Sequence, residues 1–427
     1  MERRWTFCLA GAVLLIAGAA RADVCAMKGK TCHVRVGGLV QELGFGQELN
    51  DPVRNHARVY LFVPEARLRV RAHFDRFSFV LEEGLGPEQP VLAPTPGVSI
   101  GLLDMAVNVW LGTGHRTYLK FGQFKVPYGR EELTYSGNLL FADRSIDFLG
   151  FKIGRDVGAA FVTQPGLFTL VAGIFTGGGR DVPPAHYLPE ALGVPMLVAR
   201  IGIGNAQEDP FYLSETVRDL KAPQWSLDAN ALFMRDSLIG HSSVLNVKAS
   251  DKSLLLDSDW NPYIAVHPLN QGDWVQAGAD GLVRLPVGLA TVSGEAQFDY
   301  AKFSNIFGAV ALAGLRLQAS VARGPLQAGL RYAVLFPDPS FAVGKTPVSG
   351  GQPIHEITPA VSYYIVGNYL KVTADLPILL HVPVFTEPKV GSYVGTEFPD
   401  EAALLSKGGS VGRQNVVEGR LQLQAQF

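Results

Sequence analysis

The last thirteen residues, NVVEGRLQLQAQF, alternate between apolar or small side chains and polar ones up to the final position. The apolar or small set is Val417, Gly419, Leu421, Leu423, Ala425 and Phe427, and the polar set is Glu418, Arg420, Gln422, Gln424 and Gln426. Successive side chains of a β-strand point to opposite faces, so the pattern predicts a strand with one apolar and one wet face. A soluble β-sandwich can contain such a strand, but it seldom places one at the end of its chain with a terminal aromatic residue.

Beyond its N-terminus, the chain has no uninterrupted apolar stretch of about 18 residues, the shortest that crosses a bilayer as a helix. Yet 47% of its residues are hydrophobic. In lipid, strands satisfy all their backbone hydrogen bonds only in a closed barrel. The terminal Phe427 resembles the signal that the barrel-assembly machinery recognises. We therefore expect an all-β transmembrane antiparallel β-barrel that contacts this machinery and the lipid of a Gram-negative outer membrane.

The N-terminus has the three parts of a secretory signal peptide. It begins with two arginines, continues with a short apolar run at 9–20, and ends with the small residues Ala20 and Ala22. We expect cleavage after Ala22, so that residues 1–22 are removed and residues 23–427 form the barrel domain.

Two cysteines, Cys25 and Cys32, remain after this cleavage and precede the first predicted strand. In an oxidising periplasm they could form a disulfide. The alternative is a pair of free thiols in a short tail, and the sequence leaves both open.

Alternating segments recur along the whole chain. They predict about sixteen strands, an even number, as a bacterial barrel with both ends in the periplasm requires. The predicted strand cores are 33–46, 57–75, 76–86, 102–112, 116–128, 155–164, 167–177, 196–205, 224–237, 273–286, 289–304, 307–321, 325–337, 354–366, 369–384 and 414–427.

Short and long connections alternate between these strands, which is typical of short periplasmic turns and long outer loops. Residues 129–154 follow the fifth predicted strand and form the third outer loop. One connection breaks the rule, because residues 206–223 are long where a short turn is expected. This length indicates either an insertion in that turn or an error in the strand pairing.

Charged residues within the predicted strands fall on the face opposite to the apolar residues. In EARLRVRAHFD, for example, Arg67, Arg69 and Arg71 share one face. A basic side chain on the lipid face at mid-membrane costs about 2–4 kcal/mol, so these charges should point into the lumen. Barrels of about 16–18 strands leave an aqueous channel. The pattern therefore predicts a water-filled pore with a polar wall.

Three sequence blocks, GQFKVPYGREEL, FADRSI and GRDVG, follow one another between Gly122 and Gly158. In this order and spacing they resemble the phosphate-selective porin family, of the porin O and P type, of Gram-negative outer membranes. The resemblance implies a homotrimer of sixteen-stranded barrels whose third outer loop folds into the lumen. It implies passive diffusion of small hydrophilic solutes or anions. Preference for phosphate does not follow, because only one clear arginine ladder is present.

The inward loop and its neighbours are expected to line or brace the narrowest zone of the pore. Two interpretations of the arginine ladder are open, attraction of anions or pairing with acids on neighbouring strands. For the REE and DRS blocks, a salt-bridged brace is the alternative to a solute site. The candidate residues are Arg67, Arg69, Arg71, Lys125, Arg130, Glu131, Glu132, Asp143, Arg144, Arg155 and Asp156.

Other classes of function find less support in the sequence. A formal net charge of -2 gives no basic excess, so we expect no nucleic-acid partner. The nine histidines are scattered without a motif, and metal-ligand spacings and nucleotide loops are absent. We therefore expect no enzyme activity, metal or cofactor. The alternatives are an outer-membrane barrel hydrolase, with catalytic residues near the rim, and a hydrophobic-substrate channel, with an apolar lumen or an N-terminal plug.

Overall fold

The structure is a computed structural model, and it describes most of the strands together with two segments inside the barrel. The described residues are 32–48, 57–85, 100–112, 114, 116–177, 195–206, 208–216, 220–238, 271–305, 308–337, 342–343, 346–347, 352–386 and 410–427. The predicted signal peptide, residues 1–22, and Cys25 lie outside these residues. Among the described residues, no helix has the length and apolar character needed to cross a membrane.

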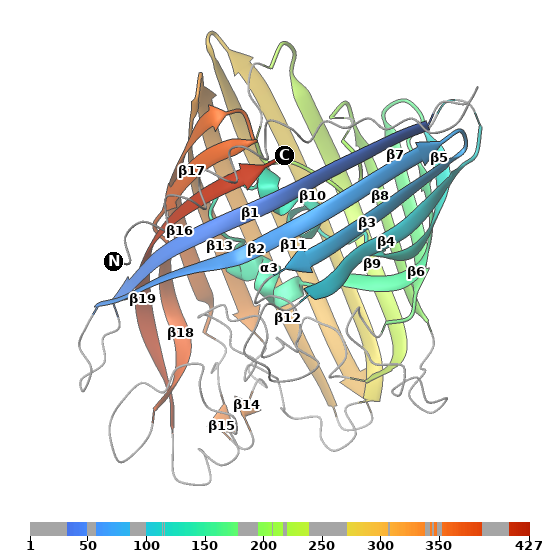
Figure 1. Ribbon diagram of the computed structural model, residues 1–427. Helices are drawn as coiled ribbons and strands as arrows, with labels where there is room; N and C mark the ends of the chain where they lie inside the picture. The colour runs from blue at the N-terminus through green and yellow to red at the C-terminus, as the bar shows by residue number, and fades with distance from the viewer. Residues whose placement is uncertain are drawn as a thin grey trace.

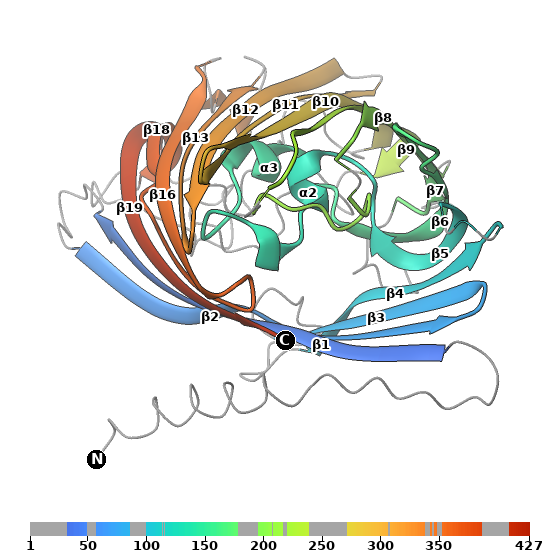
Figure 2. The ribbon, with the colours of Figure 1, turned by 90° about the horizontal axis from the view of Figure 1, so that it is seen from above.

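The strands form one closed antiparallel β-barrel (Figures 1 and 2). Its first eight strands are β1 (Cys32–Glu48), β2 (Ala57–Phe74), β3 (Phe77–Leu85), β4 (Ile100–Trp110), β5 (Thr117–Lys125), β6 (Arg155–Thr163), β7 (Phe168–Phe175) and β8 (Met196–Gly204). The others are β9 (Gln224–Leu238), β10 (Gln271–Val287), β11 (Ala290–Asn305), β12 (Gly308–Arg323), β13 (Leu326–Pro337), β16 (Ile354–Val366), β17 (Leu370–Asp375), β18 (Ile378–Thr386) and β19 (Ser410–Gln426).

The barrel has sixteen strand positions, because β17 and β18 occupy one position between β16 and β19. The predicted sixteen-stranded antiparallel barrel is therefore confirmed. The prediction of one strand over 369–384 is wrong in detail, since Leu376 and Pro377 separate β17 from β18. Proline has no N–H to donate to the strand ladder, which accounts for the interruption. A small hairpin, β14 (Ala342–Val343) and β15 (Thr346–Pro347), was not predicted.

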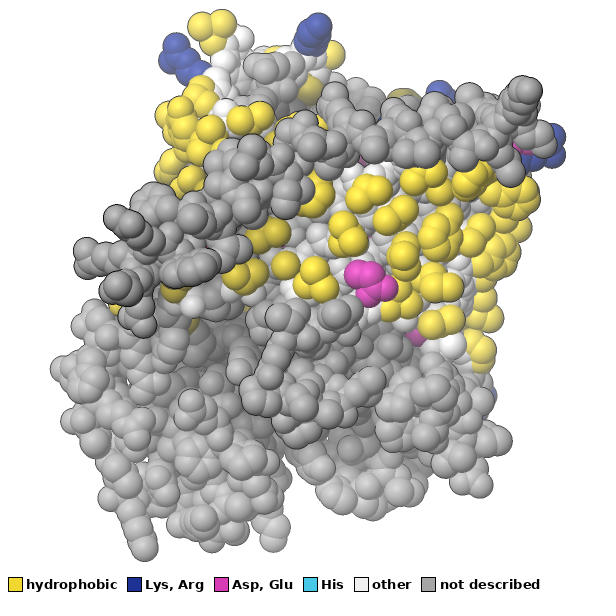
Figure 3. All heavy atoms as spheres, in the orientation of Figure 1, with side chains coloured by type: hydrophobic (Ala, Val, Ile, Leu, Met, Phe, Trp, Pro, Cys, Tyr) yellow, Lys and Arg dark blue, Asp and Glu magenta, His cyan; other side chains and the backbone are white. Residues whose placement is uncertain are grey.

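The two faces of the wall differ as the alternation predicts. On β12, Leu317 is 44% exposed on the outside, whereas the neighbouring Arg316 is fully buried on the inside. On β19, Leu421 and Gln422 show the same contrast. Figure 3 shows apolar side chains covering the outer wall in this view. The interior also contains an apolar cluster, to which Leu133, Phe151 and Phe211 belong. An apolar exterior with polar side chains inside is the arrangement that a lipid-embedded barrel requires.

The C-terminus closes the barrel against its first strand. β19 pairs with β1 from Val417 opposite Glu48 to Gln426 opposite Leu39. Beyond this ladder, the backbone N–H of Phe427 donates to the Gly38 carbonyl at 3.0 Å, and the N–H of Gly38 donates to the Phe427 carbonyl at 2.9 Å. A side chain at Gly38 would collide with the Phe427 ring, because an added Cβ would lie 2.5 Å from it. The last residue therefore takes part in the closing seam.

Candidate functional site

The connection between β5 and β6, residues 126–154, is here called the inner loop. It contains the helix α2 (Arg130–Leu133), a 3₁₀ turn (Ser136–Asn138) and the helix α3 (Ile146–Phe151). Figure 2 shows α2 and α3 inside the ring of strands. Gly129 precedes α2 with a φ of 67°, a conformation that favours glycine. Ser145 caps α3, because its hydroxyl accepts the Phe148 N–H at 3.3 Å.

Polar side chains of the barrel wall satisfy the backbone of the inner loop. Buried backbone groups need partners, and a loop with so little regular structure supplies few of its own. Gln422 donates to the Ala142 carbonyl at 2.8 Å, and Asp375 accepts the N–H of the same residue at 2.9 Å. The other wall residues that bond loop backbone groups are Gln41, Asn230, Gln276, Gln297, Arg331, Glu356, Ser362, Lys371 and Gln424. These polar side chains of the wall therefore hold the inner loop.

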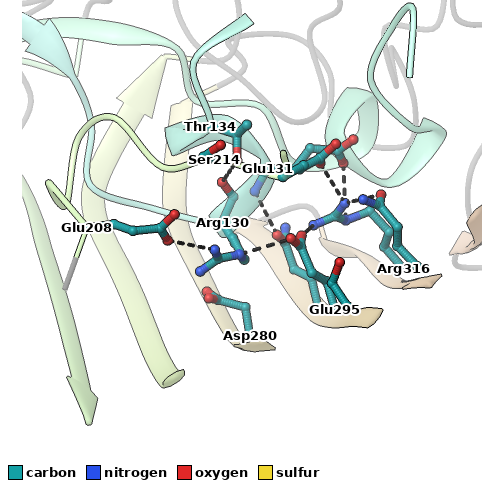
Figure 4. A network of polar contacts seen from close by, with 12 residues as sticks. Arg130, Glu131, Thr134, Glu208, Ser214, Asp280, Glu295 and Arg316 are labelled. Atoms are coloured by element: carbon teal, nitrogen blue, oxygen red, sulfur yellow. Dashed lines mark hydrogen bonds and ion pairs between the residues drawn. The ribbon is translucent and has the colours of Figure 1, made fainter. Parts of the chain in front are cut away.

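Ion pairs join α2 to the barrel wall and to Glu208 of the connection between β8 and β9 (Figure 4). Arg130 lies 2.8 Å from Glu208 and 3.5 Å from Glu295. On the other side of the helix, Glu131 lies 3.6 Å from Arg316 and 3.7 Å from Arg331. Glu131 also accepts hydrogen bonds from the N–H and the hydroxyl of Ser145, at 2.8 and 2.5 Å. One carboxylate thus joins the two helices of the loop to β12 and β13.

Two carboxyl groups of the inner loop have opposite pKa shifts. Burial opposes ionisation of Glu131, but Arg316, Arg331 and the bonds from Ser145 outweigh it and lower its pKa. Burial raises the pKa of Asp147 well above its ordinary value, and the nearby charges of Asp299 and Glu131 raise it further. The surroundings therefore favour the charged form of Glu131 and the protonated form of Asp147.

A second segment, residues 208–216 of the connection between β8 and β9, also lies inside the barrel, and it is here called the crossing segment. Its backbone bonds the inner loop. The N–H of Leu213 donates to the Leu133 carbonyl at 3.0 Å, and the Leu213 carbonyl accepts the Tyr135 N–H at 3.2 Å. Of the two interpretations of the long 206–223 connection, an insertion is therefore the correct one, since β8 and β9 pair directly.

The three arginines of the predicted ladder differ in their surroundings. Arg67 pairs with Glu65 at 2.6 Å and with Glu82 at 3.1 Å. Arg69 pairs with Glu82 and lies between two tyrosine rings, 4.4 Å from Tyr135 and 4.7 Å from Tyr212. Arg71 is exposed and stacks on Tyr212 at 4.8 Å. For Arg67 and Arg69 the geometry favours the paired interpretation, whereas Arg71 keeps its charge accessible.

Lys125 and Arg144 hold the inner loop together by bonds to its backbone carbonyls. Lys125 is buried, and its ammonium donates to the carbonyls of Glu132 and Thr134. Arg144 donates to the Thr134 carbonyl at 3.0 Å, and its guanidinium lies 4.8 Å from the Phe148 ring. Glu132 is only 8% exposed, and its Oε2 has no hydrogen-bond partner among the described residues.

The remaining predicted site residues lie within the inner loop or directly after it. Asp143 is half exposed and lies 3.9 Å from Arg420. Arg155 pairs with Asp104 of β4 at 2.7 Å. Asp156 accepts from the Thr176 hydroxyl at 2.5 Å and from the Gly177 N–H at 2.6 Å, so it fastens the end of β7. The structure thus brings most of the predicted set around one loop but gives Asp156 a partner elsewhere.

Several residues of this network were not singled out from the sequence. Glu208 joins Arg130 to Arg284, and Glu215 pairs with Arg316 at 3.1 Å. Tyr135 and Tyr212 hold the arginine ladder. The unexpected length of residues 206–223 was the one signal that pointed to the crossing segment. Within the described part of the chain, no group of three or more His, Cys, Asp or Glu side chains could hold a metal ion.

The sequence profile of the family "Phosphate-selective porin O and P" matches residues 49–187 of this chain. The match includes the arginine ladder, the inner loop and all three motif blocks. The resemblance predicted from those blocks is therefore confirmed over this region. No curated protein sequence matches the chain.

Among solved structures, the chain is similar to the anion-selective porin from Comamonas acidovorans. The two share 13% sequence identity and a TM-score of 0.52, over 93% of this chain and 100% of that one. OprB of Pseudomonas putida gives 10% identity and a TM-score of 0.52, over 93% of this chain and 94% of that one. The fold is that of a porin. At such low identities the likeness extends to the architecture of the barrel and not to its solutes.

Proposed function

We propose that the protein is an outer-membrane porin through which small hydrophilic solutes and ions diffuse passively. The observation that carries this proposal is a closed sixteen-stranded barrel with an apolar exterior and a polar interior, narrowed by an ion-paired inner loop. Barrels of about this strand number are too wide for side chains alone to fill. The match to the family profile over residues 49–187 supports the same function.

We propose a weak anion preference without a specific phosphate site. The lumenal acids that would favour cations are largely neutralised, since Asp280 pairs with Arg200 at 2.6 Å and Asp375 with Arg420 at 2.7 Å. Arg71 is exposed, and its guanidinium stacks on the Tyr212 ring at 4.8 Å. An accessible guanidinium attracts anions through its charge.

In this proposal, the end of the barrel with the short turns faces the periplasm, and the inner loop is the third outer loop. The predicted signal peptide directs export, and Phe427 serves as the signal for the barrel-assembly machinery. The position of Phe427 in the closing seam supports this role, because closure is the step that removes the last open strand edges.

We also propose a homotrimer, as the family resemblance implies. Two acidic residues face outward on β1 and β3. Glu42 is opposite Leu423, which is 39% exposed, and Glu83 is opposite Leu68, which is 43% exposed. Figure 3 shows acidic side chains within an otherwise apolar wall. Charges on a lipid face are unfavourable, so contact between copies over β1–β3 would shield them. The detergent-corrected mass of the complex should correspond to three chains, and a monodisperse monomer would refute this.

We propose that the protein is not an enzyme, although an outer-membrane barrel hydrolase was an alternative from the sequence. Liposome swelling separates the two. Liposomes containing the protein should swell in isotonic solutions of small sugars, and the rate should fall as the sugar becomes larger. Phospholipid in the same vesicles should stay intact. Vesicles that remain impermeable with folded protein would reject the porin, and lipid hydrolysis would favour the enzyme.

A further inference from the structure

We propose that the crossing segment, residues 208–216, is a second element of the channel constriction, which locks the inner loop and sets the size limit for solutes. This inference rests on the proposed porin function. The inner loop enters the lumen from the end of the barrel with the long connections, because it follows β5. The crossing segment enters from the end with the short turns, because it follows β8. Two segments that enter from opposite ends of the barrel thus form the constriction.

The two segments are joined by their backbones inside the lumen. In addition to the two bonds of Leu213, the N–H of Glu215 donates to the Asn138 carbonyl at 3.1 Å. The Glu215 carboxylate accepts the Leu140 N–H at 3.0 Å. Buried backbone groups that lose such partners are costly, because no other group replaces them. Neither segment can therefore withdraw toward its own end without breaking bonds to the other.

The crossing segment reaches opposite sides of the barrel. The Tyr212 hydroxyl donates to Asp104 of β4 at 3.1 Å. Glu215 pairs with Arg316 of β12 at 3.1 Å. In the ring of sixteen positions, β4 and β12 are eight positions apart, so these contacts lie across the diameter. Figure 2 shows the β8–β9 connection running across the inside of the ring beside α2. A solute that crosses the barrel must pass the crossing segment.

Charged and polar contacts hold the crossing segment between these walls. Glu208 lies 2.8 Å from Arg130 of the inner loop (Figure 4). It also lies 3.2 Å from Arg284 of β10. Thr216 accepts from Asn368, in the turn between β16 and β17, at 2.9 Å. Removing one partner of a buried ion pair is strongly destabilising, since the other charge stays buried. These anchors indicate a fixed restriction rather than a flexible gate.

Tyr212 places the crossing segment next to Arg71, the exposed residue of the arginine ladder. Its ring stacks on Arg69 and Arg71, at 4.7 and 4.8 Å. The crossing segment therefore lies against β2 beside Arg71, whose side chain stays exposed. The segment thus narrows the lumen next to the charge that attracts anions.

The test is a variant of unchanged length in which residues 208–216 become glycine and serine. Its single-channel conductance should exceed that of the wild type, and liposomes containing it should admit a disaccharide severalfold faster. Unchanged conductance and unchanged size dependence, in a variant that still shows heat-modifiable gel migration, would overturn the proposal. A wild type without any channel would instead reject the porin function itself.

A second variant covers the case in which the first does not fold. Tyr212→Ala leaves the backbone bonds of the crossing segment in place and removes the ring beside Arg71. It should also raise conductance and disaccharide uptake, by less than the full replacement. Arg323→Gln is the matched control, because Arg323 is exposed at the end of β12. Equal conductance for wild type, Tyr212→Ala and Arg323→Gln would contradict the proposal.

Discussion

Replacing Glu131 by glutamine removes the charge that joins both helices of the inner loop to the barrel wall. Glu131 is fully buried and lies 3.6 Å from Arg316 and 3.7 Å from Arg331. It also accepts two hydrogen bonds from Ser145, the cap of α3. Glutamine has nearly the same shape but only one carbonyl acceptor, so the variant isolates the loss of charge and of one bond.

The size of the effect follows from what each partner keeps. Breaking a buried ion pair costs about 3–5 kcal/mol when the remaining charge is left alone. Here Arg331 keeps Glu356 at 2.6 Å, and Arg316 keeps Glu215 and Glu295. What is lost is mainly one charge-assisted hydrogen bond, each of which contributes about 1.5–3 kcal/mol. We therefore expect Glu131→Gln to lower the free energy of unfolding by roughly 2–3 kcal/mol.

Urea unfolding from lipid vesicles measures this loss, and Glu132→Gln is the matched control. Glu132 is the next residue, but its Oε2 has no hydrogen-bond partner among the described residues. Its replacement should cost less than about 1 kcal/mol. Because the pKa of Glu131 is lowered in the folded state, its contribution is present above the ordinary pKa and is lost as the pH falls. Equal losses for both variants at neutral pH would refute the reasoning.

Three further predictions concern assembly, selectivity and pH. Deleting Phe427 removes both seam bonds to Gly38, so the amount of folded protein in outer membranes should fall at unchanged synthesis, and normal insertion would contradict this. Arg71→Gln should reduce the anion preference, measured by reversal potential, more than Arg67→Gln does, because Arg67 is already paired with Glu65. A larger effect of Arg67→Gln would refute this prediction. Because the pKa of Asp147 is raised, its contribution to stability is lost as the pH rises above the ordinary pKa, so the free energy of unfolding should fall less with rising pH in Asp147→Asn than in the wild type; an unchanged pH profile would refute it.

The barrel could be predicted from the sequence because its wall has a strict period of two. Each strand must present apolar residues to lipid and polar residues to the lumen, so alternation reveals both the strands and their faces. The break at Pro377 was missed because residues 376–380 are all apolar and extend the apparent strand. The predicted number of strand positions is nevertheless correct, because β17 and β18 occupy one position in the barrel.

The interior was less predictable, because its contacts join residues far apart in the sequence. The motif blocks identified Arg130 and Glu131, but their charged partners lie on other strands or on the crossing segment. Glu208 and Glu215 stand in a connection whose only signal was its length. The local sequence pattern shows that a charged side chain points inward. It does not show the partner of that side chain, which depends on how two segments from opposite ends of the barrel meet.

Single-channel recording in a planar lipid bilayer tests the central claim most directly. The purified wild-type protein should insert as stable, ohmic channels, because the ion-paired interior contains a fixed restriction. In a salt gradient, the reversal potential should indicate weak anion preference that declines at high salt, where the screening length falls to about 3 Å at 1 M. Folded protein that inserts without conducting would contradict the porin, and a clear cation preference would contradict the assignment of the accessible charge to Arg71.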